Sequence, residues 1–419
     1  MEEIGLQGLR PLIDKCVLCG GCHPDCPTYK LTRYEHDAAR GKVILADALL
    51  KGTVQPTQKL AETFAHCLSC MACTQACPAG ADPARVIVAA RGELFKKTGS
   101  LLEKTVFRKI LTNNRAMPFL SGFLKFIAAL SRIYPGLPGI SKFNREGLMK
   151  VFPGFSLDRM KNRFPQTIPA KGRRIMRVGY FTGCMTDWAF QSNGAAVVNI
   201  LSSAGAEVIL LKDEVCCGAP AFFAGDVEGA KISAEKNLRA FVGNDFDYIV
   251  TSCATCGSML KNEYPRIIGG AEAKEFSSKV VDFQKLYVDK LLANVMTENK
   301  TGEKIKVTYH DPCHLSRGMG VVKEPREILK KLSGVEFVEM READSCCGGA
   351  GMFNAKNYSD SLEIGKRKGK NIADSGAVIV VTECPSCQMQ LMDITARYCP
   401  GVAVLHAAEF LSRFIRKRK

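Results

Sequence analysis

Two stretches of the chain repeat one arrangement of cysteines, and this duplication constrains the fold more than any other feature. Each copy has a single cysteine, an adjacent pair before a glycine, and a C-x-x-C motif. The single cysteine precedes the pair by 32 residues in the first copy and 33 in the second, and the pair precedes the C-x-x-C by 36 and 37. The cysteines are Cys184, Cys216, Cys217, Cys253 and Cys256 in the first copy, and Cys313, Cys346, Cys347, Cys384 and Cys387 in the second. Such agreement indicates an internal duplication.

Apolar runs of strand length come shortly before cysteines in both copies. VGYFT precedes Cys184, DYIVTS precedes Cys253, KVTYH precedes Cys313 and AVIVVTE precedes Cys384. Helical stretches such as GAKISAEKNLRAFV and SLEIGKRKGKNIA alternate with these runs, which predicts an α/β lobe with a small parallel sheet for each copy. Because ligand sites of such sheets lie beyond the carboxyl ends of the strands, the cysteines of each lobe should converge at one edge.

Five cysteines at a repeated spacing indicate a metal site rather than buried small hydrophobic residues or disulfides. Free cysteine is often buried for packing, but packing does not require the same spacing twice. Thiolates are soft ligands that select iron-sulfur clusters or zinc. Five thiolates exceed the usual four ligands of zinc, so they favour a polynuclear cluster, and zinc in one copy remains an alternative. Gly218 and Gly348 lack a side chain that would crowd the adjacent pair.

The N-terminal part carries another cysteine motif, C-x-x-C-x-x-C-x-x-x-C-P, in two copies. The runs read CVLCGGCHPDCP (16–27) and CLSCMACTQACP (67–78), which is the spacing of two-cluster ferredoxins, where the fourth cysteine binds the cluster of the other run. A zinc ribbon has no use for the third and fourth cysteines. The predicted ligands are Cys16, Cys19, Cys22 and Cys77 for one 4Fe-4S cluster, and Cys67, Cys70, Cys73 and Cys26 for the second.

The sequence divides into four regions. About forty residues between the two runs have apolar positions at helical spacing, which predicts an all-helical ferredoxin-type domain, and Asp82 before Pro83 predicts the start of a helix through residue 97. The predicted fold is therefore multidomain, α+β and α/β, with a helical domain before two duplicated α/β lobes. The regions are a two-cluster ferredoxin-like domain (1–97), a basic, partly apolar helical connection (98–175), a first lobe (176–300) and a second lobe (301–419).

The charge of the chain bears on its partners. The formal net charge is +16, and residues 142–177 hold ten Lys or Arg against two acidic residues. A basic segment can contact nucleic acid, anionic membrane or an acidic protein, but no recognition-helix or zinc-finger spacing accompanies it, so no nucleic acid is expected. The apolar run 117–139 contains Lys125 and Arg132 and is too short and too charged to span a bilayer. It predicts a helix packed on protein, with the membrane interface as the alternative.

The cysteine content and the first residues predict where the chain is located. The N-terminus shows no secretory signal, and 19 cysteines in 419 residues indicate metal binding in the cytoplasm rather than disulfides. Peripheral contact with the inner face of the cell membrane remains open. Cys399 lies outside both motifs and is predicted to be a structural thiol. His310 and His314 flank Cys313 and are expected to hydrogen-bond to strand ends, with cluster ligation as the alternative.

These features together resemble the iron-sulfur subunits of glycolate oxidases and of the related D-lactate dehydrogenases. The resemblance rests on the eight ferredoxin-type cysteines, the two CCG sets, the stretch CPTYKLTRYEHDAARGKVILADALLKG and the motif CCGGAGMF. It implies an oxidoreductase subunit that relays electrons from an FAD-containing 2-hydroxy-acid dehydrogenase, acting on glycolate or D-lactate, to a quinone or an electron-carrier protein. The implied cofactors are two 4Fe-4S clusters and one or two further iron-sulfur clusters, noncubane in type, in the CCG lobes.

A second function is implied by the similar architecture of heterodisulfide reductases. Glycolate oxidase subunits can lack members of the CCG sets, whereas both sets here are complete, as two noncubane clusters would require. The alternative is therefore reduction of a disulfide or thiol substrate at a CCG-bound cluster, which needs an open face in a cavity. A relay cluster is better buried. No G-x-G-x-x-G follows a predicted strand, so the flavin is expected on a partner chain, and no catalytic residue is predicted here.

Overall fold

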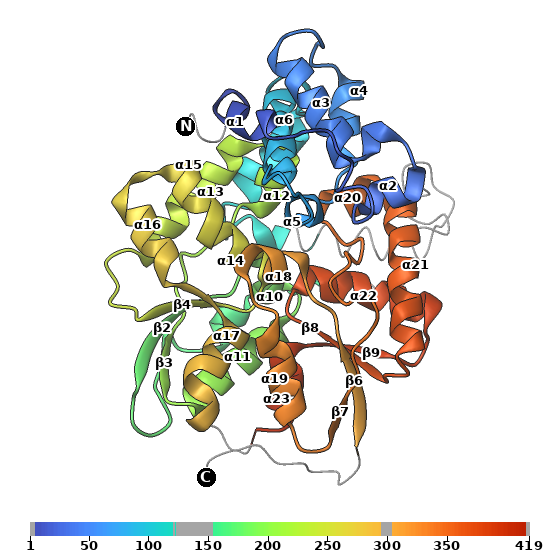
Figure 1. Cartoon of the computed structure of the whole chain (residues 1–419). Coiled ribbons are helices and arrows are strands. Elements are labelled where there is room, and N and C mark those ends of the chain that lie inside the picture. The colour runs from blue at the N-terminus through green and yellow to red at the C-terminus, as the bar shows by residue number, and fades with distance from the viewer. Residues whose placement is uncertain (1–4, 120–121, 123–153, 295–303, 416–419) are drawn as a thin grey trace.

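The computed structural model describes residues 5–119, 122, 154–294 and 304–415, and it consists of three parts. A helical N-terminal unit lies above two α/β lobes, which lie side by side beneath it (Figure 1). Helices dominate the N-terminal unit, and each lobe contains a small, mainly parallel sheet, so the predicted fold class is confirmed. The apolar run 117–139 falls largely outside the described residues, as do residues 142–153 of the basic segment.

The N-terminal unit is built around one long helix, α6. Asp82 caps this helix because its carboxylate accepts a hydrogen bond from the Arg85 backbone N–H (3.2 Å), as the Asp-Pro signal predicted. α3 and α4 pack on α6 through a shared apolar core. The helices are η1 (Gln7–Leu9), α1 (Arg10–Asp14), α2 (Pro27–Thr32), η2 (Glu35–Asp37), α3 (Ala39–Leu50), α4 (Gln58–Ala65), α5 (Ala72–Gln75) and α6 (Pro83–Thr98).

The first lobe contains a sheet of strand order β1-β3-β2-β4-β5, in which only β1 runs antiparallel to its neighbour. Its strands are β1 (Thr167–Ile168), β2 (Met176–Phe181), β3 (Ala206–Ile209), β4 (Tyr248–Thr251) and β5 (Val280–Asp282). Its helices are η4 (Met160–Arg163), α10 (Cys184–Trp188), α11 (Gln191–Ser203), α12 (Ala219–Ala224), α13 (Val227–Phe241), α14 (Ala254–Ser258), η5 (Met259–Glu263), α15 (Tyr264–Ile268), α16 (Gly270–Lys279), α17 (Phe283–Leu286), η6 (Tyr287–Leu291) and η7 (Leu292–Asn294).

The second lobe repeats this topology in a parallel sheet of order β7-β6-β8-β9. Its strands are β6 (Ile305–Tyr309), β7 (Val335–Phe337), β8 (Ile379–Thr382) and β9 (Ala403–His406). Its helices are α18 (Cys313–Met319), α19 (Lys323–Lys331), α20 (Met352–Lys356), α21 (Tyr358–Asp374), α22 (Pro385–Tyr398) and α23 (Ala407–Ser412). In each lobe the chain first adds a strand on one side of the first parallel strand and then crosses to its other side. The strand order therefore reverses between β2 and β4 in the first lobe and between β6 and β8 in the second. Ligands of such sheets bind at this reversal, beyond the carboxyl ends of the strands.

The two lobes are related by an approximate twofold axis. α14 of the first lobe packs against α18 of the second, and their counterparts α22 and α10 also pack together. Hydrogen bonds cross the contact between the lobes: Asn193 Nδ2 donates to Gln388 Oε1 (2.7 Å), and the Ala254 N–H donates to the Glu383 carbonyl (3.1 Å). One apolar core includes side chains of both lobes. The lobes therefore form one packed body with the loops after β4 and β8 in contact.

The segment between the N-terminal unit and the first lobe differs in part from the expected helical connection. It begins with α7 (Leu101–Thr105) and a turn of π-helix, η3 (Val106–Ile110), and Arg108 forms an ion pair with buried Asp226 (2.7 Å). It then contributes β1 to the sheet of the first lobe, a strand that the sequence did not predict because it is only two residues long. In the described part of the chain, no helix has the length and apolar character needed to cross a bilayer.

Candidate functional site

The eight ferredoxin-type cysteines line two adjacent cavities in the N-terminal unit. The outer set consists of Cys16, Cys19, Cys22 and Cys77, and the inner set consists of Cys26, Cys67, Cys70 and Cys73. Each set combines three cysteines of one run with the fourth of the other, which is the grouping predicted from the sequence. Cys73 also lines the outer cavity, so the two sets adjoin. Four thiols around one cavity provide the donor set of a 4Fe-4S cluster, and the residues therefore fit that cofactor.

The backbone of both runs is strained at equivalent positions. Leu18 and Ser69, each directly before the second cysteine of its run, have φ of 56° and 52°. These are left-handed values that non-glycine residues rarely adopt and that persist where surrounding structure enforces them. The backbone N–H of Gly21 points at Cys19 Sγ (3.5 Å), and that of Ser69 points at Cys67 Sγ (3.4 Å). The loops thus aim N–H groups at the sulfurs, which stabilises thiolate ligands.

The two sets differ in their exposure to solvent. Cys19 of the outer set is exposed, and Val17 beside it is 67 % exposed. In the inner set Cys26, Cys70 and Cys73 are buried. Burial raises the pKa of the Cys70 thiol to about 12, so this thiol ionises at neutral pH only with a metal or another positive charge beside it. The outer set therefore lies at the surface and the inner set in the interior.

The ten CCG cysteines lie where the strand order reverses in each lobe. The single cysteines begin α10 and α18, and Cys253 and Cys384 are the residues that cap α14 and α22. Gly218 and Gly348 after the adjacent pairs have φ of 86° and 89°. A Cβ on Gly348 would lie 2.5 Å from the Ser361 carbonyl oxygen, so glycine is required for this close approach.

Neighbouring thiols interact with one another in one continuous series through both lobes. In the first-lobe set the order is Cys184, Cys216, Cys217, Cys256, Cys253, and in the second-lobe set it is Cys313, Cys346, Cys347, Cys387, Cys384. Cys253 and Cys384 interact across the contact between the lobes. The neighbouring thiol of Cys216 lowers the pKa of Cys217 to about 5, and that of Cys346 lowers the pKa of Cys313 to about 6. Soft, partly ionised sulfurs gathered in this way fit a metal cofactor.

The second-lobe set, rather than the first, lies against the N-terminal unit. Cys70 of the inner set and Cys313 are close enough for the charge of Cys313 to raise the pKa of Cys70, after the larger effect of burial. Arg317 holds this contact because its side chain donates to Gln75 Oε1 (2.7 Å), to the Cys70 carbonyl (3.5 Å) and to Asp344 Oδ2 (2.8 Å). The sets therefore follow one another as outer, inner, second-lobe and first-lobe.

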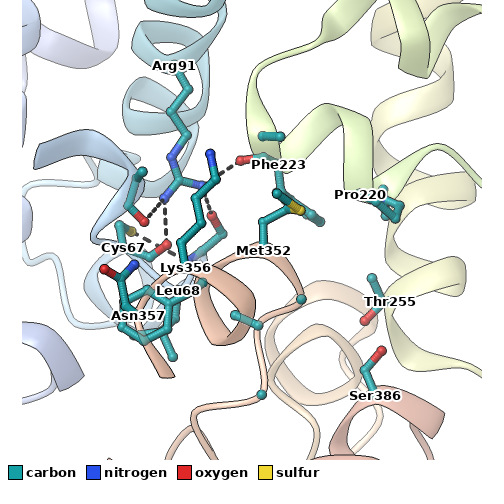
Figure 2. Close-up of a pocket in the computed structure, with 18 of the residues that line it drawn as sticks. Cys67, Leu68, Arg91, Pro220, Phe223, Thr255, Met352, Lys356, Asn357 and Ser386 are labelled. Atoms are coloured by element: carbon teal, nitrogen blue, oxygen red, sulfur yellow. Dashed lines mark hydrogen bonds between the residues drawn. The ribbon is translucent and has the colours of Figure 1, made fainter. Parts of the chain in front are cut away.

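A cavity of about 580 Å³ lies between the three parts of the molecule (Figure 2). All five cysteines of the second-lobe set line this cavity, together with Cys67 of the inner set. None of the cysteines of the first-lobe set does. Apolar side chains such as Phe95, Phe223 and Met352 form much of its wall. His314 stacks on Phe223 with ring centroids 5.0 Å apart. The second-lobe set thus has an open face, and the first-lobe set is enclosed.

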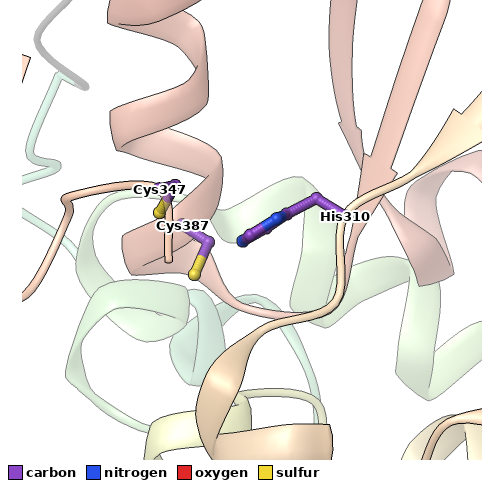
Figure 3. Close-up of side chains that lie close together, drawn as sticks. All are labelled: His310, Cys347 and Cys387. Atoms are coloured by element: carbon purple, nitrogen blue, oxygen red, sulfur yellow. The ribbon is translucent and has the colours of Figure 1, made fainter. Parts of the chain in front are cut away.

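His310 adds a nitrogen donor to the second-lobe set (Figure 3). A ring nitrogen of His310 and the sulfurs of Cys347 and Cys387 all lie within 4.8 Å of one another. Neither ring nitrogen of this buried residue has a hydrogen-bond partner among the residues described, contrary to the expected hydrogen bond to a strand end. Phe181 precedes Cys184 by three residues, as His310 precedes Cys313, so the first lobe lacks this donor. In the sequence, the only indication of this role is a histidine three residues before the single cysteine of the second copy.

The remaining two residues singled out in the sequence have ordinary environments. His314 forms hydrogen bonds with the Thr255 hydroxyl and with the Ser69 carbonyl, both at 3.2 Å, and so links all three parts of the molecule. Cys399 is buried in the apolar core of the second lobe, and burial raises the pKa of its thiol. The environment of Cys399 is that of a structural thiol.

Comparisons with known proteins agree with this arrangement. The model of the cysteine-rich domain family CCG matches residues 178–261 and 307–392, and that of the 4Fe-4S dicluster domain matches residues 12–81. The chain is 29% identical to the probable glycolate oxidase iron-sulfur subunit of Bacillus subtilis (strain 168), over 94% of this chain and 92% of that protein.

Two further proteins match over a shorter part of this chain. The chain is 32% identical to lactate utilization protein A of Oceanobacillus iheyensis over 57% of this chain and 97% of that protein. It is 36% identical to one subunit of the fumarate reductase (CoM/CoB) of Methanothermobacter marburgensis over 56% of this chain and 46% of that protein.

Proposed function

Since the chain belongs to the family of iron-sulfur oxidoreductase subunits that includes lactate utilization protein A and the glycolate oxidase iron-sulfur subunit, we propose that it relays electrons for a 2-hydroxy-acid dehydrogenase. The donor is an FAD-containing dehydrogenase on a partner chain that oxidises glycolate or D-lactate. The acceptor is a quinone or an electron-carrier protein. The outer and inner sets hold 4Fe-4S clusters, and the CCG sets hold one or two further clusters, with zinc in one lobe as the alternative.

The observation that carries this proposal is the unbroken succession of cysteine sets. The outer and inner sets share the wall formed by Cys73, Cys70 adjoins Cys313, and Cys384 adjoins Cys253. Iron-sulfur clusters accept and release single electrons, and their potentials are set by hydrogen bonds to sulfur, charge and burial. The residues of this chain contribute by holding successive sites within contact of each other and by enclosing all but the outer and second-lobe sets.

The cavity wall supports a lipid-soluble acceptor at the second-lobe set. α7 borders the cavity through Glu103 and leaves Leu101 and Leu102 81% and 73% exposed. Lys97 and Lys104 flank these leucines. Exposed leucines beside cations favour an interface with anionic lipid. We therefore place peripheral membrane contact, and entry of a quinone, at α7 in this proposal.

The substitution Cys70→Ser tests the relay. We expect loss of the spectral signal of one ferredoxin-type cluster and loss of electron flow from glycolate or D-lactate to the carrier, because Cys70 lies between the outer set and the second lobe. Reduction of the flavin in the partner should continue. The measurements are electron paramagnetic resonance (EPR) spectroscopy, flavin bleaching by stopped flow, and turnover with a soluble quinone. Cys399→Ser is the matched control, with its clusters intact, and undiminished turnover in Cys70→Ser would contradict the proposal.

A second candidate function is reduction of a disulfide in the cavity. It is favoured by the open face of the second-lobe set and by the similarity to the fumarate reductase (CoM/CoB) subunit. Breaking an S–S bond to give two thiols takes up two electrons from a donor and two protons. If this function holds, the purified, chemically reduced chain should convert an added disulfide to thiols, Cys387→Ser should abolish the conversion, and no flavoprotein should be needed. Thiol release measured by a colorimetric reagent checks this outcome.

A further inference from the structure

Arg91 is a buried cation that no carboxylate neutralises among the residues described. It lies in α6, and only 7 % of it is exposed. Its guanidinium donates to the carbonyls of Phe64 (2.8 and 2.9 Å), Ala65 (3.4 Å), Cys67 (2.5 Å) and Phe223 (2.6 Å), and to the Ser69 hydroxyl (3.0 Å). Figure 2 shows Arg91 at the cavity wall, with its side chain directed toward Cys67 and Phe223. All of the acceptors are neutral.

Such a placement is costly unless a negative charge lies near. Burying an ion without a partner is strongly unfavourable, and a guanidinium cannot release its proton to escape this cost. Hydrogen bonds to carbonyls recover only part of it. The group beside Arg91 that would carry negative charge as a cluster ligand is the sulfur of Cys67, a member of the inner set, whose carbonyl the same guanidinium contacts. The side chain is therefore placed where it compensates negative charge gathered at the inner set.

A second buried cation lies at the inner set. Lys42 is 1% exposed, donates to the His36 carbonyl (2.9 Å), and lies 3.8 Å from the Asp37 carboxylate. Lys42 and Asp37 both line the inner cavity. The outer cavity has only a neutralised cation in its lining, because Arg40 forms two hydrogen bonds with the Glu35 carboxylate (2.7 and 2.9 Å) and is partly exposed to solvent. The inner set thus has a net excess of fixed positive charge that the outer set lacks.

We propose that Arg91, assisted by Lys42, is a positioning residue that raises the reduction potential of the cluster held by the inner set above that of the outer set. This inference rests on the proposed ligand sets. Adding one electron makes the cluster more negative, and a fixed cation in a low-dielectric interior stabilises the reduced form. The proposal also gives the relay a direction, since an electron arriving at the exposed outer set moves to lower free energy when it passes inward, toward the second lobe.

The test compares Arg91→Met with Arg91→Lys in redox titrations followed by EPR. Arg91→Met should shift the one-electron reduction equilibrium of the inner cluster at least tenfold toward the oxidised form, which is 59 mV, and leave the outer cluster within about threefold. Arg91→Lys retains the charge and should keep both clusters within about threefold of the wild type. The inner cluster is identified as the signal that Cys70→Ser removes. Arg174→Gln, a substitution of an exposed arginine in the first lobe, is the remote control.

Substitutions that remove a positive or a negative charge distinguish an electrostatic role of these residues from a structural one. Lys42→Met should shift the inner cluster in the same direction as Arg91→Met, and Asp37→Asn, which removes a negative charge from the same cavity wall, should shift it in the opposite direction. A purely structural role of Arg91 predicts no such reversal. Equal shifts in Arg91→Met and Arg91→Lys, or unchanged potentials in Arg91→Met, Lys42→Met and Asp37→Asn, would overturn the inference.

Iron and sulfide content separate this inference from the proposed function. If Arg91→Met fails to fold, the Lys42 and Asp37 variants still decide the sign of the effect. Wild-type protein that binds fewer than eight irons in the N-terminal unit would contradict the ligand sets themselves. Wild-type protein with both clusters present, but with the inner potential at or below the outer, would contradict only the inference on Arg91.

Discussion

At the scale of single residues, His406 at the contact between the lobes makes the stability of the fold sensitive to pH. His406 is fully buried, its Nε2 donates to the Ser252 carbonyl (2.8 Å), and its Nδ1 accepts from the Ala408 N–H (3.2 Å). This arrangement holds a neutral imidazole, and burial lowers its pKa to about 4. The ordinary pKa of histidine in an unfolded chain is about 6.5. The unfolded state therefore binds a proton at mildly acidic pH that the folded state excludes.

The direction of the pH effect follows from this difference. The contribution of His406 to stability is present in full above about pH 6.5 and is lost as the pH falls toward 4. At pH 5.5 the loss is about 1.4 kcal/mol. We expect the free energy of unfolding of His406→Gln to fall less between about pH 7.5 and 5.5 than that of the wild type, in anaerobic urea titrations. The same pH dependence in both proteins would contradict this account of His406.

The residues of the site differ in how far the sequence predicts them. The cysteines were predictable because ligands to one metal recur at fixed spacing, and the structure brings each predicted set together. Arg91 was not, because an arginine in a helix is ordinarily exposed and its burial depends on Phe223, 132 residues away. His310 stood out only by its nearness to Cys313. Its place beside Cys347 and Cys387, and its lack of a hydrogen-bond partner among the described residues, arise only in the folded chain.

At the scale of elements, α14 and α18 cross closely enough to require small residues. A Cβ on Gly318 would lie 2.5 Å from Ser258 Oγ and 2.9 Å from Ser258 Cβ, and a Cβ on Gly257 would lie 2.3 Å from Met319 Sδ. Methionine can bend away, but the Cβ of a serine in a packed helix cannot. These helices follow Cys253 and Cys313, so their spacing fixes the distance between the cysteine sets.

The substitution Gly318→Val should therefore destabilise the contact between the lobes. Inserting a branched side chain into a packed interior costs about 1–3 kcal/mol, and we expect an unfolding free energy lower by that amount, with weaker coupling between the signals of the two CCG sets. Chemical denaturation and EPR relaxation measurements check the two effects. Gly154→Ala, where an added Cβ meets no atom within 4 Å, is the control and should behave as the wild type.

The sequence predicted the long elements of the fold and missed the shortest. The strands before the cysteines are apolar runs bounded by polar or glycine residues, and β2, β4, β6 and β8 lie within or overlap the predicted runs. β5 and β9 were missed because three or four residues such as VVD and AVLH carry too few alternations to establish a period. They become strands because β4 and β8 offer unpaired edges.

At the scale of the whole molecule, the two lobes differ in their access to solvent. The cavity reaches the second-lobe set and not the first. A water-soluble iron chelator should therefore remove metal from the second lobe before the first, and the outer set, with Cys19 exposed, should also lose iron early. Iron release followed by absorbance and EPR checks this order. Simultaneous loss from both lobes would contradict the difference in enclosure.

The assembly of the three parts lay beyond prediction from the sequence. Composition and spacing predicted a ferredoxin-type unit and two similar lobes, but not which lobe's cysteine set would adjoin the unit. That choice depends on pairs far apart in the chain, such as His66 Nε2 with Asp360 Oδ2 (3.0 Å) and Arg317 with Gln75 (2.7 Å). Such pairs leave no local pattern, because each partner also occurs as an ordinary surface residue.

The duplication of the lobes within one chain also bears on how such a protein can evolve. Two separate copies of a single lobe, joined as a homodimer about the same axis, would have to keep both cysteine sets alike, because every substitution would appear twice. Fusion removes that restriction. The difference between Phe181 and His310 and the contact of the N-terminal unit with the second-lobe cysteine set but not the first are asymmetries that a homodimer could not have acquired. A fused pair can keep one lobe as an enclosed partner while selection reshapes the other for exchange with the surroundings.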